Sequence, residues 1–100
     1  DHNFVLDKPE GAFDWMAKAY CEKTGIALEA YTDCPGVQFY AANFVDNEKG
    51  KNGAVYDKRH AFCLESQYCP NAVNDTHFAQ PFLKAGEKYD TKTVYRFLVK

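Results

Sequence analysis

The sequence predicts an all-β fold, a sandwich or a barrel of antiparallel strands. Short apolar runs recur along the chain, and Gly, Pro, Asn and Asp separate them at frequent intervals, as is typical of strands joined by turns. No stretch has a convincing helical periodicity. The chain has 100 residues, of which 46% are hydrophobic and 16% aromatic, and this is enough for the core of one domain.

The first half of the chain is predicted to contain a strand end, a hairpin and a further strand. Residues 4–6 form a short apolar strand end. The segment before the tight turn at residues 23–25 suits a helix or a strand, but the residues after this turn alternate between apolar and polar. We therefore interpret residues 15–32 as an antiparallel hairpin. After a Pro-Gly pair, a strand is predicted over residues 37–44.

The second half begins with the most polar and glycine-rich segment, residues 46–53, which we expect to be an exposed loop. A strand is predicted over residues 61–67. Residues 68–74 form an irregular crossing, because their proline cannot donate a ladder hydrogen bond. Residues 81–84 are expected to form a short strand. Residues 93–99 give the strongest strand signal, since they are rich in β-branched and aromatic side chains.

Charge and hydropathy exclude several classes of partner. The formal net charge is -2, the sequence pI is about 5.9, and the Lys and Arg residues form no patch or run. These features argue against binding to nucleic acid or to an anionic membrane. No apolar run approaches the roughly 20 residues that a membrane-spanning helix needs, and no signal peptide is visible. We therefore expect a soluble protein.

The four cysteines, Cys21, Cys34, Cys63 and Cys69, would suggest two disulfides in a small secreted protein. Each cysteine lies in an apolar or turn context, however, and a chain this hydrophobic can fold without cross-links. Free, buried thiols of a cytoplasmic protein are the simpler interpretation. A zinc site could be assembled from His60, Cys63 and Cys69, but the paired spacings typical of zinc ligands are absent. We predict no metal site.

One carboxylate, that of Glu65, follows directly on the apolar run of residues 61–64. If this run is buried, Glu65 is desolvated, and burial raises the pKa of a carboxylic acid towards the range useful for a general base. The alternative is that Glu65 only ends a strand and points into water, as most glutamates do.

Several stretches, in this order, resemble the aldose 1-epimerases, also called galactose mutarotases. They are residues 1–6 (DHNFVL), 32–40 (TDCPGVQFY) with Asn43 and Phe44, 50–56 (GKNGAVY), 62–67 (FCLESQ), 70–74 (PNAVN) and 83–87 (LKAGE). The resemblance covers nearly the whole chain. It implies that residues 1–100 are the C-terminal part of a single large antiparallel β-sandwich domain, a supersandwich, with the sugar bound in an open cleft on one sheet.

The resemblance also implies roles for three residues. Glu65 matches the general base that acts on the anomeric hydroxyl, Asp1 matches an aspartate that hydrogen-bonds sugar hydroxyls, and Gln38 matches a glutamine that lines the cleft. Carboxylates and amides are suited to these roles, because they accept or donate hydrogen bonds to hydroxyl groups. The implied protein is an isomerase that interconverts the α and β anomers of a free aldose such as galactose or glucose. The reaction needs no metal or organic cofactor.

The family's general acid is a histidine on an earlier part of the chain, and none of His2, His60 and His77 matches its motif. We therefore expect the N-terminal remainder of the enzyme to be a partner of this chain, and the 100 residues alone to be inactive. Two alternatives stay open. An epimerase of a phosphorylated hexose would need added basic groups, for which only Lys58 and Arg59 are candidates. A non-catalytic carbohydrate-binding module would keep the fold, although the intact Glu65 argues against it.

Overall fold

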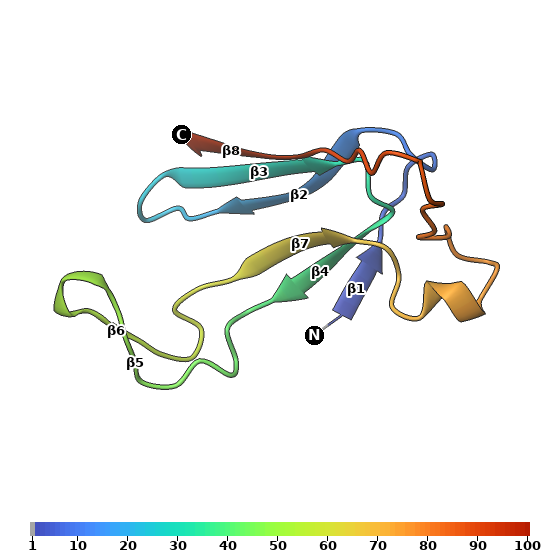
Figure 1. Cartoon of the computed structure of the whole chain (residues 1–100). Helices are drawn as coiled ribbons and strands as arrows, with labels where there is room; N and C mark the ends of the chain where they lie inside the picture. Colours follow the sequence, from blue (N-terminus) through green and yellow to red (C-terminus); the bar gives the residue numbers. More distant parts are fainter. Residues whose placement is uncertain (1) are drawn as a thin grey trace.

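The computed structural model of the chain describes residues 2–100, and its strands form two layers (Figure 1). One layer, sheet A, has the order β1-β4-β7, and the other, sheet B, has the order β2-β3-β8. All strand pairs are antiparallel, and the described residues contain no α-helix. The all-β prediction is confirmed. The strands are β1 (His2–Val5), β2 (Asp14–Tyr20), β3 (Ile26–Thr32), β4 (Gly36–Tyr40), β5 (Glu48–Lys49), β6 (Val55–Tyr56), β7 (Cys63–Gln67) and β8 (Thr93–Val99).

The predicted hairpin is present as β2 and β3, with Asp14 opposite Thr32 and Ala19 opposite Leu28. Its turn depends on Gly25, which has a φ of +73° and would place a Cβ atom 2.6 Å from the Lys100 carbonyl oxygen. Only glycine adopts this conformation at low cost and leaves room for the approaching chain. Gly25 therefore closes the hairpin turn and also leaves room for Lys100, which follows β8, to pack beside this turn.

The two sheets pack face to face through a small apolar core. Met16 of β2, Ala30 of β3 and Val37 of β4 are buried together, and Leu64 of β7 packs against them. Burying such an aliphatic side chain contributes about 1.5 to 3 kcal/mol to folding. Two hydroxyl groups lie in contact beside this core, that of the fully buried Thr32 and that of Thr93 of β8.

Several predicted strands differ from those of the structure, among them the strand end predicted over 4–6, which is found as His2–Val5. The strand expected over 37–44 ends at Tyr40, because Ala42 has a φ of +54° and turns the chain away. The strand expected over 61–67 begins only at Cys63. No strand forms over residues 81–84, because no strand of the described residues lies beside this segment to pair with it. The strand predicted over 93–99 is confirmed as β8.

The loop expected over residues 46–53 is almost entirely exposed, as predicted, but it contains structure. Glu48–Lys49 pairs with Val55–Tyr56 as a two-stranded ribbon that projects from the sandwich (Figure 1), and Lys51–Gly53 forms a short 3-10 helix. A second 3-10 helix, Ala72–Asn74, follows β7. No helix among residues 2–100 is long and apolar enough to cross a membrane.

All four cysteines are free thiols, but the expected burial is wrong for two of them. Cys34 is buried and Cys69 is half-buried, whereas Cys21 and Cys63 are exposed. Cys21 lies in the turn after β2, and Cys63 begins β7, which pairs with β4 alone among the described strands. These two positions lie where the described part of the sandwich provides no covering layer.

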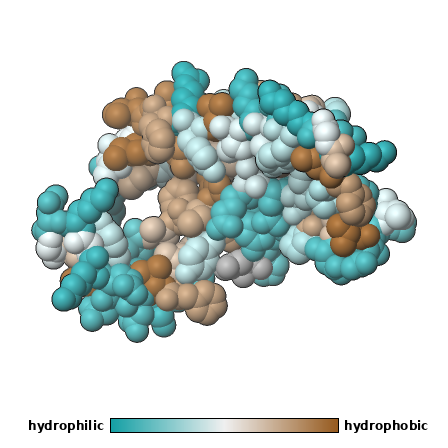
Figure 2. All heavy atoms as spheres, in the orientation of Figure 1, coloured by the Kyte–Doolittle hydropathy of each residue, from teal (hydrophilic) through white to brown (hydrophobic). Residues whose placement is uncertain are grey.

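Apolar side chains reach the surface at the end of sheet B that carries the C-terminus, where Figure 2 shows hydrophobic atoms. Phe97 and Val99 of β8 are 74% and 83% exposed. Phe97 is in register with Leu28, and Val99 with Ile26, so the four side chains form one continuous apolar strip. Sheet A does not extend over this strip.

Candidate active site

A row of three polar side chains crosses sheet A. Asn3 of β1 lies opposite Gln38 of β4, and Gln38 lies opposite Glu65 of β7. Side chains directly opposite each other in antiparallel strands point to the same face, with Cβ atoms about 5 Å apart. The neighbours Val37 and Leu64 point into the core, so this polar row of Asn3, Gln38 and Glu65 lies on the face of sheet A turned away from sheet B.

The structure therefore brings together two of the three site residues that the sequence predicted, Gln38 and Glu65. The third, Asp1, lies outside the described residues. Of the two alternatives for Glu65, burial is wrong and exposure to water is found, because its side chain is exposed and Phe62, in the preceding run, is 45% exposed. The physical reason is the position of Glu65 on the outward face of β7, which no other described residue covers.

The backbone around Glu65 is nevertheless firmly held. The Ser66 hydroxyl, one residue further along β7, lies 2.7 Å from the hydroxyl of Thr93 in sheet B. The residue before Glu65, Leu64, accepts a 2.6 Å hydrogen bond at its carbonyl oxygen from the Tyr95 hydroxyl. Both neighbours of the candidate base are thus tied to β8. An exposed carboxylate on a fixed backbone is a suitable arrangement for accepting a proton from a bound ligand.

Asn3 was not singled out by the sequence as a site residue, and the structure adds it. Its side-chain amide packs over Gly36, where a Cβ atom would lie 2.5 Å from the Asn3 Oδ1. Its Nδ2 donates to the Cys69 Sγ at 3.4 Å, and its Oδ1 is buried without a hydrogen-bond partner among residues 2–100. The available signal was the position of Asn3 in residues 1–6, the stretch that also contains Asp1 and that carries part of the family resemblance.

An aromatic pair lies beside the polar row. Tyr40 follows Gln38 by two residues along β4, so the two side chains share a face. The Tyr40 and Phe44 rings stack with centroids 6.3 Å apart and an angle of 13° between them, and the Tyr40 hydroxyl accepts a hydrogen bond from the Phe44 backbone. An aromatic surface next to amide and carboxylate groups is suited to a ligand with both C–H and hydroxyl groups.

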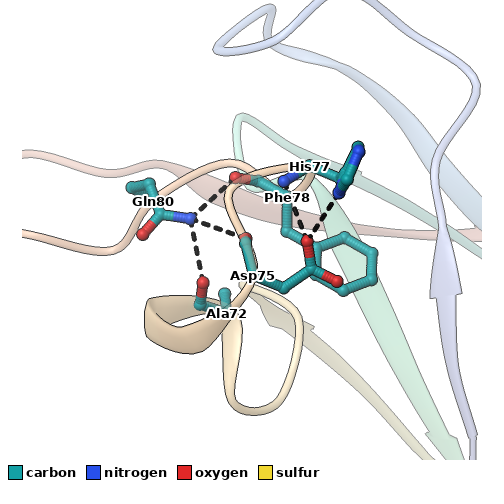
Figure 3. A network of polar contacts seen from close by, with 5 residues as sticks. All are labelled: Ala72, Asp75, His77, Phe78 and Gln80. Carbon is teal, nitrogen blue, oxygen red and sulfur yellow. Dashed lines mark hydrogen bonds and ion pairs between the residues drawn. The ribbon is translucent and has the colours of Figure 1, made fainter.

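The histidines do not join the polar row. His77 lies in the segment after β7, where its backbone N–H and its Nδ1 both lie 2.9 Å from one Asp75 oxygen (Figure 3). The backbone hydrogen bond from His77, followed by the contact with the ring, lowers the pKa of Asp75. In the same turn, Gln80 donates to the carbonyl oxygens of Ala72, Asp75 and Phe78. These contacts give His77 a structural role in closing the turn.

His60 is closer to the candidate base along the chain, and both line an open hollow of about 610 Å³ together with Tyr95 and Phe97. The His60 Nδ1 accepts a hydrogen bond from the Asp57 backbone at 3.2 Å, which ties the ring to its own turn. Among residues 2–100, no three His, Cys, Asp or Glu side chains gather as metal ligands would, so His60, Cys63 and Cys69 do not meet in such a group.

Comparison with known proteins identifies the family. Residues 1–96 match the family model described as aldose 1-epimerase. Over 100 residues, the chain is 48% identical to galactose mutarotase of Homo sapiens and 45% identical to that of Rattus norvegicus, covering 99% of this chain and 29% of each relative. It is 30% identical to aldose 1-epimerase of Escherichia coli (strain K12), covering 98% of this chain and 29% of that protein. The chain thus spans less than a third of these relatives, and it belongs to the aldose 1-epimerase family.

Proposed function

We propose that this chain supplies the general base and part of the sugar cleft of an aldose 1-epimerase. The full-length protein would interconvert the α and β anomers of a free aldose such as galactose or glucose. The observation that carries this proposal is the register of sheet A, in which Gln38 lies opposite the exposed Glu65. Family membership and the names of the relatives support the same reaction.

In the proposed mechanism, Glu65 removes the proton of the C1 hydroxyl while an acid protonates the ring oxygen. The C1–O5 bond breaks, the resulting aldehyde rotates about the C1–C2 bond, and the ring closes with the proton transfers reversed. Two positioned proton carriers are sufficient, because a hemiacetal opens without a metal or an organic cofactor. Gln38 and Asp1 hold the other sugar hydroxyls, so that the anomeric carbon stays next to Glu65.

The acid is assigned to a histidine outside this chain. His60 and His77 are each engaged in their own turns, and the relatives are more than three times as long as this chain. The remainder of the protein would pack against the sandwich and complete the cleft. We place the enzyme in the cytoplasm, where reducing conditions would keep the four cysteines as free thiols.

The test is polarimetry on the full-length protein with freshly dissolved α-galactose, with galactose 6-phosphate as the comparison substrate. We expect accelerated mutarotation of free galactose and a weaker effect on the phosphate ester. A preference for the ester would instead favour an epimerase of a phosphorylated hexose, with Lys58 and Arg59 as candidate phosphate ligands. Binding of galactose without any acceleration would favour a non-catalytic module.

A further inference from the structure

We propose that Asn3 is a positioning residue of this site, whose amide keeps the Gln38 side chain beside Glu65. The inference rests on the proposed function, in which Gln38 binds the sugar. It begins with the register of sheet A. Asn3 lies directly opposite Gln38, on the side of β4 away from Glu65, so Gln38 is the middle member of the polar row. A contact that holds the Gln38 side chain in place along this row therefore also sets the distance between Gln38 and Glu65.

The Asn3 amide occupies the space over Gly36, the residue of β4 that precedes Gln38 on the same face of the strand. A Cβ atom on Gly36 would lie 2.5 Å from the Asn3 Oδ1 and 3.0 Å from the Nδ2, so the amide rests directly on the β4 backbone. Gly36 and Gln38 are two residues apart on one strand and share a face. The Asn3 amide therefore prevents the Gln38 side chain from folding back over Gly36. The space that remains for Gln38 lies towards Glu65 and Tyr40.

A second contact holds the amide in this place. The Asn3 Nδ2 donates to the Cys69 Sγ at 3.4 Å, and Cys69 lies in the segment that leaves β7. One side chain thus joins β1, the backbone of β4 and the segment after β7. These are the three parts of the chain that carry or follow the polar row.

Stability alone does not explain an asparagine at this position. The Asn3 Oδ1 is buried, and none of residues 2–100 donates a hydrogen bond to it. An acceptor buried in this way destabilises the fold, and a small apolar residue would avoid the cost. Buried polar atoms that lack a hydrogen-bond partner are characteristic of functional sites. In this proposal, the cost is retained because the amide positions Gln38.

The experiment is a double-mutant cycle in the full-length protein, with Asn3→Ala, Gln38→Ala and the double variant. The readouts are the dissociation constant for galactose by calorimetry, KM and kcat by polarimetry, and the thermal midpoint. We expect Asn3→Ala to keep a midpoint near that of the wild type and to weaken galactose binding and raise KM about 10-fold. We expect kcat to change less than KM. The double variant should bind no more weakly than Gln38→Ala alone, because Asn3 acts through Gln38.

Two further variants keep the inference testable if Asn3→Ala does not fold. Cys69→Ala removes the sulfur that accepts from Asn3 and should raise KM, whereas Cys69→Ser retains an acceptor and should restore most of the affinity. Asn74→Ala is the control, because it removes an exposed amide that, among residues 2–100, bonds only to Asn71 within its own turn. It should leave KM unchanged.

Additive effects of Asn3→Ala and Gln38→Ala, or an Asn3→Ala variant with wild-type KM and affinity, would overturn the role of Asn3. If no Asn3 variant folds, equal KM values for Cys69→Ser and Cys69→Ala would also overturn this role. A wild-type protein that binds galactose but does not accelerate mutarotation would contradict the proposed function only. The double-mutant cycle on the dissociation constant for galactose would then still decide the role of Asn3, because this constant measures binding and not turnover.

Discussion

The hydroxyl of Ser66 lies 2.7 Å from the hydroxyl of Thr93, and this contact crosses from sheet A to sheet B next to the candidate base. Thr93 in turn lies 3.3 Å from the hydroxyl of the fully buried Thr32, which also accepts a hydrogen bond from the Cys34 backbone. Three hydroxyls therefore connect the interior of sheet B to the residue that follows Glu65. Removing one of them should disturb both stability and the position of the carboxylate.

We predict that Ser66→Ala lowers the free energy of unfolding of the full-length protein by about 0.5 to 1.5 kcal/mol, the net value of one hydrogen bond. Because Ser66 adjoins Glu65, kcat for mutarotation should fall several-fold while KM changes little. Urea denaturation and polarimetry measure the two effects. Tyr31→Phe is the matched control, because it removes a hydroxyl whose one hydrogen bond within residues 2–100 is to Glu29, on the opposite face of sheet B. If both variants retain the wild-type kcat, the Ser66 contact does not position Glu65.

For Glu65→Gln, we predict a full-length protein that folds and binds galactose but loses about 10²- to 10⁴-fold in kcat. The amide has nearly the same shape as the carboxylate, and it can still bond to a hydroxyl, but it cannot accept the proton. The exposure of Glu65 makes a large loss of stability from this change unexpected. Polarimetry gives the rate, and calorimetry with galactose gives the affinity. Unchanged mutarotation would remove Glu65 from the mechanism.

The strands that the sequence predicted best are those whose signals are local. The hairpin over residues 15–32 and the final strand over 93–99 carry alternation, a glycine turn or β-branched residues within the segment itself. The failures have causes that strand composition and alternation do not show. The chain leaves β4 at Tyr40 because Ala42 adopts a positive φ, and residues 81–84 have strand composition but no described strand to pair with.

The site was predictable only in part for the same reason. The motifs indicated Gln38 and Glu65, but no local pattern shows that the two are direct partners across β4 and β7. The burial of Glu65 was inferred from its apolar neighbours, whereas alternation along a strand sends Leu64 inwards and Glu65 outwards. The packing of Asn3 over Gly36 joins residues 33 positions apart in the sequence, and only the fold brings them together.

Asp33 provides a prediction about pH. Its carboxylate accepts hydrogen bonds from the Thr91 hydroxyl at 2.5 Å and the Lys92 backbone at 2.9 Å, which anchors the segment before β8 to the turn after β3. The bond from Thr91, with a smaller contribution from Lys92, holds the pKa of Asp33 below its ordinary value against the opposing effect of burial. A carboxylate whose pKa is lowered by folding stabilises the fold above its unfolded pKa, and this contribution is lost as the pH falls through the folded pKa.

We therefore predict that Asp33→Asn lowers the free energy of unfolding by about 1 kcal/mol near neutral pH, since the site is only partly shielded from water. The difference from the wild type should begin to shrink as the pH falls below about 4, where the carboxyl of the unfolded chain takes up a proton, and it should vanish at lower pH, once the folded carboxyl is protonated as well. Urea denaturation at a series of pH values measures this difference. Asp90→Asn is the control, because Asp90 is largely exposed and lies 4.0 Å from Lys88. A difference that does not depend on pH would contradict the assignment.

The last prediction concerns residues 1–100 expressed alone, which we expect to self-associate and to lack mutarotase activity. In the apolar strip formed by Ile26, Leu28, Phe97 and Val99, every member except the half-buried Leu28 is exposed, and exposed strips of this kind favour association. Among the described strands, β7 and β8 each pair on one side only, so their other edges are open to another chain. Activity should be absent because no histidine of this chain is assigned as the acid.

Size-exclusion chromatography and polarimetry on the same preparation test both halves of this prediction. Replacing Phe97 and Val99 together by lysine should shift the chain towards the monomer without producing activity, since the substitutions remove the apolar surface but add no acid. Adding the separately expressed remainder of the protein to the unmodified chain should restore both a defined size and mutarotation. A soluble, active monomer of residues 1–100 would contradict the prediction and would make one of His2, His60 and His77 the general acid.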